Sequence, residues 1–252
     1  MPKQKIVIAN WKMRLGLAES IVLAKAYAEH IKTETVEVVA CASEIALTGV
    51  GEALRQGPVK LGGQNVFWEE KGEYTGEVSA KTLAEAGCSF VIIGHSERRM
   101  HLLENYEMIH QKLKAVLDHT SIIPILCVGE TQREKEAGKT DYVILDQLQQ
   151  SLGGIELLAD KQLIVAYEPI WAIGSGHAIG PDDVNTMHEI IHASLVDLLG
   201  VDAAKKQVRV IYGGSVNAGN VASFRAIDNV DGFLVGTASV DVMEFAQIVN
   251  SL

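Results

Sequence analysis

The sequence has no hydrophobic run that approaches the roughly 20 consecutive apolar residues needed to cross a membrane, so we expect a soluble protein. It also lacks an excess of basic residues: 32 acidic residues outnumber 22 lysines and arginines, for a formal net charge of −10. Nucleic acids and anionic membranes are bound through basic surfaces, so neither is expected as a partner. An anionic small molecule is compatible with this charge if a local cation and backbone N–H groups bind it.

Cysteine and proline are both scarce. The cysteines Cys41, Cys88 and Cys127 are odd in number and widely spaced, so we expect reduced, buried thiols and not disulfides or metal ligands. With five prolines and no low-complexity segment, nothing marks a linker, and residues 1–252 are expected to form one domain. The N-terminal stretch MPKQKIVIAN carries no cleavage site of the signal-peptide kind, which favours a cytoplasmic location.

Short apolar runs rich in β-branched residues are the main feature that is present. Segments with helical apolar spacing lie between them, such as Ala18–Ile31, Tyr106–Leu117, Val184–Leu199 and Val240–Val249. This alternation predicts a parallel sheet covered by helices, and eight strands close a (β/α)8 barrel. An open, doubly wound sheet is the alternative. The predicted strands are Ile6–Ala9, Val36–Cys41, Val59–Gly62, Phe90–Ile93, Ile122–Val128, Leu163–Tyr167, Val208–Tyr212 and Gly232–Val235.

The stretch AYEPIWAIGSG follows the sixth predicted strand and carries one carboxylate, Glu168. Ligand sites of α/β proteins collect at the C-terminal ends of strands, where Glu168 would lie. Pro169 disfavours the α region for the residue before it, so it holds Glu168 in an extended conformation. Apolar anchors followed by glycines are typical of a lid with a rigid tip and mobile hinges. The alternative is a tight turn with a solvated glutamate.

Two other strand ends bring further ionisable groups. Lys12 follows the first strand in NWKM, and His95 and Glu97 follow the fourth in GHSERR. An isolated lysine would commonly extend into water along Trp11, and a lone histidine is more often a hydrogen-bonded spectator than a catalyst. Because His95 shares its strand end with an acid that can hold Lys12, we interpret this group as functional.

Glycine-rich turns end the seventh strand (YGGSV) and the eighth (LVGTASV). Glycines let backbone N–H groups converge on an anion, and the loops after strands seven and eight of barrels often hold phosphate. We expect a dianion site here, with Asn217 as a possible cap of the following helix. The fifth strand ends in CVGETQ, where Glu130 or Thr131 begins a helix. We expect this segment to pack against the residues that contact the ligand and not to contact the ligand itself.

The motifs NWKM, HSERR, CVGE, AYEPIWAIGSG, YGGSV and LVG-ASV occur here in one order, each after a predicted strand. With them the chain closely resembles the triosephosphate isomerase family over nearly its whole length. The resemblance implies a glycolytic and gluconeogenic enzyme that interconverts dihydroxyacetone phosphate and D-glyceraldehyde 3-phosphate. It implies neither a metal nor a cofactor.

By this resemblance Glu168 is the base, His95 the electrophile and Lys12 the substrate-binding cation, while Asn10 positions the substrate and Glu97 holds Lys12. Backbone N–H groups are implied to bind the phosphate, at Gly174, Ser215, Gly236 and Thr237. A lid over residues 169–179, with Leu234 as its apolar counterpart, is implied to close on the substrate; its residues include Pro169, Ile170, Trp171, Ala172, Ile173, Gly174, Ser175 and Gly176.

The segment Gln64–Glu77 resembles the loop through which this family forms homodimers. The residues expected in the contact are Gln64, Asn65, Thr75, Gly76 and Glu77, with Thr75 reaching the neighbouring site. A solvated surface loop is the alternative, although a loop of this length in a compact domain usually has a function.

The sequence departs from the family's usual pattern at Arg14 (commonly Asn), Leu102–Leu103 (Phe-Gly), Ser175 (Thr), the hinge His177–Ile179 and Thr237 (Gly). None of these changes removes a catalytic group. At Thr237 we expect a negative φ, because a residue that opens a helix approaches helical dihedral angles. Two other functions stay open: a barrel lyase or aldolase with Lys12 as its Schiff-base lysine, and a binding protein that has kept the fold without the activity.

Overall fold

The computed structural model describes residues 3–174 and 179–252, and the predicted lid residues Ser175 and Gly176, with the hinge positions 177–178, lie outside the described residues. Eight parallel strands form a closed barrel in which each strand pairs with the next and β8 pairs with β1. The open-sheet alternative is therefore wrong. The strands are β1 (Ile6–Asn10), β2 (Glu37–Ala42), β3 (Val59–Gly63), β4 (Phe90–Ile93), β5 (Ile123–Val128), β6 (Leu163–Tyr167), β7 (Val208–Tyr212) and β8 (Gly232–Val235).

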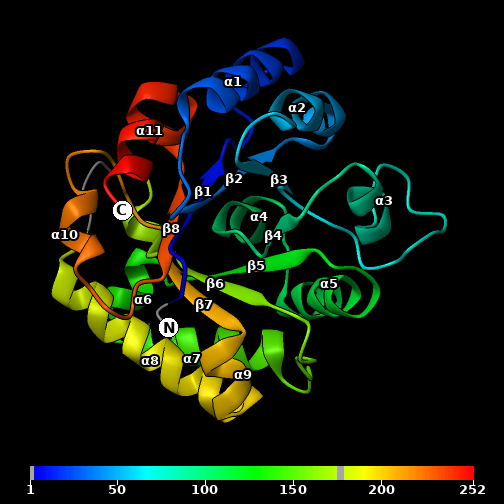
Figure 1. Ribbon diagram of the computed structural model, residues 1–252. Helices are drawn as coiled ribbons and strands as arrows, with labels where there is room; N and C mark the ends of the chain where they lie inside the picture. The colour runs from blue at the N-terminus through cyan, green and yellow to red at the C-terminus, as the bar shows by residue number, and fades with distance from the viewer. Residues whose placement is uncertain (1–2, 175–178) are drawn as a thin grey trace.

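Helices surround the strands, as Figure 1 shows. The α-helices are α1 (Leu17–His30), α2 (Leu47–Leu54), α3 (Ala80–Glu85), α4 (Ser96–His101), α5 (Tyr106–His119), α6 (Gln132–Glu136), α7 (Thr140–Leu152), α8 (Pro181–Leu199), α9 (Val201–Lys206), α10 (Val221–Arg225) and α11 (Val242–Asn250). Short 3-10 helices add η1 (Glu44–Ala46), η2 (Ile170–Ala172) and η3 (Thr237–Val240).

The predicted helix bounds are close, and the largest differences have local causes. The last helix begins at Val242 and not at Val240, because the Asp241 side chain accepts from the N–H groups of Met243 and Glu244 and so caps it. Helix α8 begins at Pro181, three residues before the predicted start, with proline at its first position. That position leaves an N–H unpaired in any residue, so proline is tolerated there.

Two apolar layers follow from the alternation of side chains along each strand. Ile6 and Ile8 of β1 belong to a cluster inside the barrel, whereas Val7 and Ala9 belong to the larger cluster between barrel and helices. Both faces of the sheet are thus covered, which explains why the strands appear in the sequence as continuous apolar runs. Cys41, Cys88 and Cys127 are buried free thiols, as predicted.

Charged side chains close the N-terminal end of the barrel interior. Glu37 contacts Lys60 at 2.6 Å and Arg209 at 2.5 Å, and all three stand in register with inward-facing residues. Burial raises the pKa of Glu37, but its two cationic partners outweigh burial and the pKa is lowered. The loops that carry the predicted site residues lie at the opposite, C-terminal end of the barrel.

No helix among the described residues is long and apolar enough to span a membrane.

Candidate active site at the C-terminal end of the barrel

Glu168 follows directly on β6 and is 2 % exposed, so it is not the solvated residue of the alternative interpretation. Its N–H donates to the carbonyl of Val128 on β5 at 2.7 Å. Two neighbouring glycines make room for it. A Cβ at Gly129 would lie 1.7 Å from the Glu168 carbonyl oxygen, and one at Gly213 would lie 2.7 Å from its Cγ. Glycine at both positions is therefore a condition for the placement of this carboxylate.

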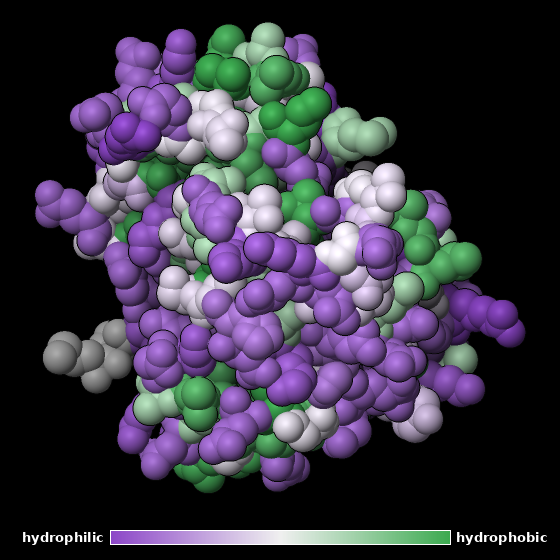
Figure 2. All heavy atoms as spheres, turned by 90° about the vertical axis from the view of Figure 1, so that its right-hand side faces the viewer, coloured by the Kyte–Doolittle hydropathy of each residue, from purple (hydrophilic) through white to green (hydrophobic). Residues whose placement is uncertain are grey.

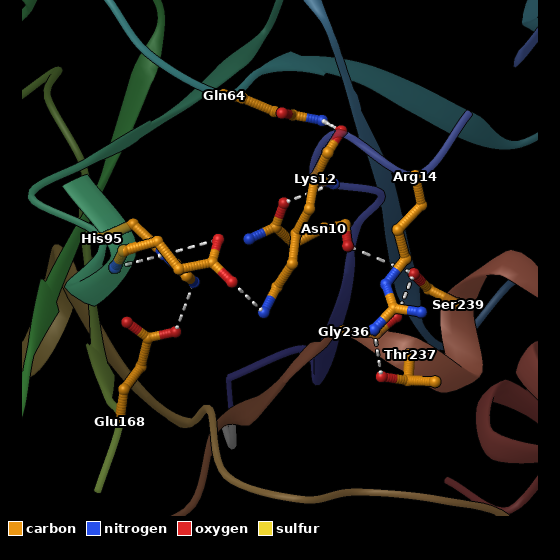
Figure 3. A network of polar contacts seen from close by, with 10 residues as sticks. Asn10, Lys12, Arg14, Gln64, His95, Glu168, Gly236, Thr237 and Ser239 are labelled. Carbon is orange, nitrogen blue, oxygen red and sulfur yellow. Dashed lines mark hydrogen bonds and ion pairs between the residues drawn. The ribbon is translucent and has the colours of Figure 1, made fainter. Parts of the chain in front are cut away.

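His95 caps the first turn of α4 and faces Glu168 (Figure 3). Its Nδ1 accepts a hydrogen bond from the N–H of Glu97 at 3.2 Å, and its Nε2 lies 3.1 Å from Glu168 Oε1. Since Nδ1 is an acceptor, the ring proton is on Nε2 and points at the carboxylate. Burial raises the pKa of the Glu168 carboxyl, but His95, Arg99 and Lys12 together lower it by more, so the pKa lies below its usual value. Glu168 is therefore ionised at neutral pH and available as a base.

Lys12 stands after β1 with an unusual backbone, at φ 52°. Two side chains hold this strained conformation: Asn10 Oδ1 accepts from the Lys12 N–H at 3.0 Å, and Gln64 Nε2 donates to the Lys12 carbonyl at 3.0 Å. Lys12 Nζ contacts Glu97 at 2.9 Å. The predicted pairing of Glu97 with Lys12 is thus present. Gln64, predicted only for a dimer contact, also holds the Lys12 backbone within the same chain.

One cavity of about 390 Å³ brings these residues together with the predicted anion-binding turns. A Cβ at Gly214 would lie 2.0 Å from the Tyr212 hydroxyl, so this turn after β7 requires glycine. Asn217 accepts from the N–H groups of Gly219 and Asn220, and α10 begins only at Val221, so Asn217 is not its cap. Of the predicted residues, the cavity lining includes Asn10, Lys12, His95, Glu97, Glu168, Ile173, Gly174, Ser215, Leu234, Gly236 and Thr237.

Thr237 opens η3 without a positive φ: among the non-glycine residues that the structure describes, only Lys12 and Leu103 have one. The expectation of a negative φ is thus confirmed. The hydroxyl of Thr237 caps no helix and accepts from Arg14 Nη2 at 3.1 Å. Arg14 and Glu244 line the cavity as well, and sequence reasoning did not single them out for the site.

The start of the predicted lid, residues 169–174, is attached to the loop after β5. Trp171 Nε1 donates to Glu130 at 2.8 Å, the N–H of Ile170 donates to the Glu130 carbonyl at 3.0 Å, and Lys135 Nζ lies 3.2 Å from the centre of the Trp171 ring. Thr131 begins α6 through a capping box, as the sequence indicated. The loop after β5 therefore contacts the start of the predicted lid directly. This is the supporting role that the sequence predicted for the loop.

Comparison with known proteins decides the family. A sequence model described as triosephosphate isomerase matches residues 5–252. The chain belongs to the triosephosphate isomerase family. Relatives named triosephosphate isomerase include those of Dictyoglomus turgidum (42% identical over 250 residues, 99% of this chain and 100% of the relative) and Caldanaerobacter subterraneus (40% over 248 residues, 98% and 99%). The one from Synechocystis is 41% identical over 250 residues, covering 98% of each chain.

The predicted dimer loop, residues 64–77, exposes only part of its apolar side chains. Phe67 and Trp68 are half-buried and stack at 4.0 Å between ring centres, Tyr74 is 44% exposed, and Thr75, Gly76 and Glu77 are exposed. Asn65 is tied inward by Lys112 at 2.8 Å. Figure 2 shows the side of the molecule that carries α3 and α5: hydrophobic residues gather at the top, at the right-hand edge and at the bottom, and the middle of this face is mainly hydrophilic.

A second cavity, of about 650 Å³, opens beside the first and shares five lining residues with it: Asn10, Lys12, Arg14, His95 and Glu97. Its lining also includes Gln64 and Asn65. Exposed apolar side chains occur in the same loops: Met13 is 96% exposed, Ile45 78%, Leu102 61% and Leu103 82%. Leu103 has φ 56° where the family pattern has glycine, so the departure noted in the sequence carries backbone strain.

Proposed function

We propose that this chain is an isomerase that interconverts dihydroxyacetone phosphate and D-glyceraldehyde 3-phosphate. Membership of the triosephosphate isomerase family supports the reaction. One observation supports the assignment of residues above all others: an ionised, buried Glu168 lies 3.1 Å from His95 Nε2, in a cavity that Lys12 also lines.

In this proposal Glu168 removes a proton from the carbon next to the substrate's carbonyl and returns it to the neighbouring carbon. A carboxylate whose pKa is lowered accepts this proton only if the product, an enediolate, is stabilised at the same time. Glu168 Oε2 has no hydrogen-bond partner among the described residues, so this oxygen is available to the substrate. Pro169 and the two glycines beside Glu168 set its position before the substrate arrives.

Stabilisation of the enediolate comes from His95 and Lys12. The Nε2–H of His95, which faces Glu168 in the structure, donates to the substrate's oxygen as negative charge develops there. Lys12 adds a positive charge held in place by Glu97, and Asn10 supports the Lys12 backbone. In a cavity closed to water these charge interactions gain strength.

Backbone N–H groups of Gly174, Ser215, Gly236 and Thr237 are proposed to bind the phosphate. Supporting this, all four residues line the cavity that contains Glu168. The lid over residues 169–179 would close over the bound substrate with Ile173 facing Leu234, both of which line the same cavity. Closure would exclude water and so suppress the loss of phosphate from the enediolate.

We also propose a homodimer, as the resemblance implies, and a cytoplasmic location, which the N-terminal sequence favours. Exposed apolar side chains at Met13, Ile45 and Leu103, together with the cavity beside the active site, support a contact in which the partner's Thr75 loop enters that cavity. Sedimentation should give twice the chain mass of 27.3 kDa. A monomer that is fully active at micromolar concentration would contradict the dimer, and cell fractionation tests the location.

A coupled assay of glyceraldehyde 3-phosphate consumption tests the proposed reaction. Isomerase activity should appear in the purified chain and be lost in Lys12→Met, which removes the cation without adding bulk. The lyase alternative requires a lysine amine that is free to attack a carbonyl, whereas Lys12 Nζ is engaged by the Glu97 carboxylate at 2.9 Å. Cleavage products, or no reaction at all, would favour the lyase or the inert binding protein respectively.

A further inference from the structure

The charges that line the active-site cavity do not by themselves favour a dianionic ligand. Two cations, Lys12 and Arg14, face three carboxylates, Glu97, Glu168 and Glu244. The charge of Lys12 is offset by Glu97 at 2.9 Å. Arg14, in contrast, takes part in none of the ion pairs found among the described residues. Arg14 is thus the cation of this cavity whose charge is available to a ligand.

The position of Arg14 places it beside the proposed phosphate-binding turn. Arg14 stands two residues after Lys12, in a turn closed by its N–H and the carbonyl of Trp11 at 3.3 Å. Its side chain extends to the turn that follows β8, where Nη2 donates to Thr237 Oγ1 at 3.1 Å (Figure 3). A guanidinium carries five N–H donors, so the others are free to bind the oxygens of a phosphate.

The turn that receives Arg14 is itself firmly held. Ser239 Oγ donates to the Gly236 carbonyl at 2.6 Å, the Ser239 N–H donates to the same oxygen at 2.9 Å, and the Tyr27 hydroxyl donates to the Ser239 carbonyl. Thr237 therefore offers its hydroxyl from a fixed position. Glycine there would provide no acceptor, so the orientation of Arg14 depends on this threonine.

We propose that Arg14 is a second cation for the substrate's phosphate group and that the Thr237 hydroxyl orients it. This inference rests on the proposed function, since it assumes a phosphorylated substrate in the cavity. Arg14 and Thr237 are two of the positions at which the chain departs from the family's usual pattern, and the structure joins them in one contact. The pair acts on affinity for the phosphate and not on the proton transfer at Glu168.

The test compares Arg14→Gln with wild type and with Arg55→Gln, a control that makes the same change in net charge. Arg55 is 68% exposed at the end of α2, away from the cavity lining. Arg14→Gln should raise KM for glyceraldehyde 3-phosphate about tenfold, the lower range for a hydrogen bond between charged groups, with kcat within about twofold. The inhibition constant of inorganic phosphate should rise by a similar factor, and the difference from wild type should shrink as salt is added.

Three further measurements separate phosphate binding from a structural role. Unphosphorylated D-glyceraldehyde should be turned over with unchanged kcat/KM by Arg14→Gln, and Arg14→Lys should recover part of the affinity because it restores the charge. Thr237→Val, which replaces the hydroxyl by a methyl group and keeps the β-branched shape, should raise KM by a few fold. The double variant should behave like Arg14→Gln alone because the two residues act as a unit.

An unchanged KM and phosphate inhibition constant in Arg14→Gln would overturn the proposal, as would an equal loss with unphosphorylated D-glyceraldehyde or in Arg55→Gln. Independent, additive effects of the two substitutions would overturn the role given to Thr237. Wild-type protein without isomerase activity would instead contradict the proposed function itself, so the two failures are distinguishable.

Discussion

Protonation of one buried histidine should make the folded state markedly less stable below neutral pH. His188, on α8, is fully buried, and its Nδ1 lies 2.9 Å from the Asn229 carbonyl. Nε2 has no hydrogen-bond partner among the described residues. The pKa of His188 is lowered from 6.5 to about 4: burial is the largest cause, the Asn229 carbonyl acts in the opposite direction, and the nearby His192 and Lys5 add to the lowering. Protonation would thus place an unsolvated charge against apolar neighbours.

The size of this effect on the free energy of unfolding follows from the linkage between proton binding and folding. Between pH 6.5 and 4 the unfolded chain binds a proton at this histidine that the folded chain does not, so stability rises with pH over that window. A shift of this size corresponds to about 3 kcal/mol in the free energy of unfolding, of which about 2 kcal/mol is lost by pH 5. Above pH 6.5 the contribution is complete, and below pH 4 no more is lost.

Urea unfolding at fixed protein concentration, repeated from pH 4.5 to 7, measures this dependence in wild type and in His188→Gln. The glutamine amide keeps a donor for the Asn229 carbonyl but does not titrate. Carboxylates that titrate in acid are the same in both proteins, so their contribution cancels in the comparison. The variant should show a pH slope that is smaller by about 2 kcal/mol across the range. Identical slopes would refute the account of His188, whatever the difference in absolute stability.

Three more substitutions test how the site is held. Gly213→Ala should lower kcat by roughly 100-fold at nearly unchanged thermal stability, because its Cβ would lie 2.7 Å from Glu168 Cγ and displace the carboxylate; a variant with normal turnover would show that this glycine is dispensable. Glu104 is a buried carboxylate that contacts Arg98 at 2.5 Å and Lys112 at 2.7 Å. Glu104→Gln should lower the free energy of unfolding by about 3 kcal/mol or more, because it leaves both cations uncompensated, and chemical denaturation gives the value. Trp171→Phe removes the 2.8 Å bond to Glu130 and should change the rate of lid movement in stopped-flow measurements without altering the fold; unaltered kinetics would mean that this bond does not anchor the lid.

The strands were predictable from the sequence to within one residue at every end. Apolar β-branched runs are unambiguous when both faces of a sheet are covered, and the alternation with helices specifies a parallel arrangement. The positions of Glu168, His95 and Lys12 at one end of the barrel followed from the same pattern. In a parallel barrel the C-terminal ends of all strands lie at one mouth, so residues after different strands meet there.

Contacts between loops were beyond sequence reasoning. The bond from Gln64 to the Lys12 carbonyl joins residues 52 positions apart, and the one from Arg14 to Thr237 joins residues 223 positions apart. Neither leaves a local periodicity or spacing, because each depends on where a side chain points after the loops have packed. The start of α11 was misplaced for a related reason: Val240 continues the apolar pattern, but the Asp241 cap sets the boundary.

The role of Glu168 as the base is the central claim, and shortening its side chain by one methylene tests it most directly. Glu168→Asp keeps the negative charge and the backbone conformation that Pro169 imposes. It withdraws the carboxylate from its present position, in which Oε1 lies 3.1 Å from His95 Nε2. The account predicts that kcat falls by on the order of 100-fold while KM changes by only a few fold and the melting temperature stays close to wild type. A purified, folded Glu168→Asp variant with unchanged kcat would contradict the claim that Glu168 transfers the proton.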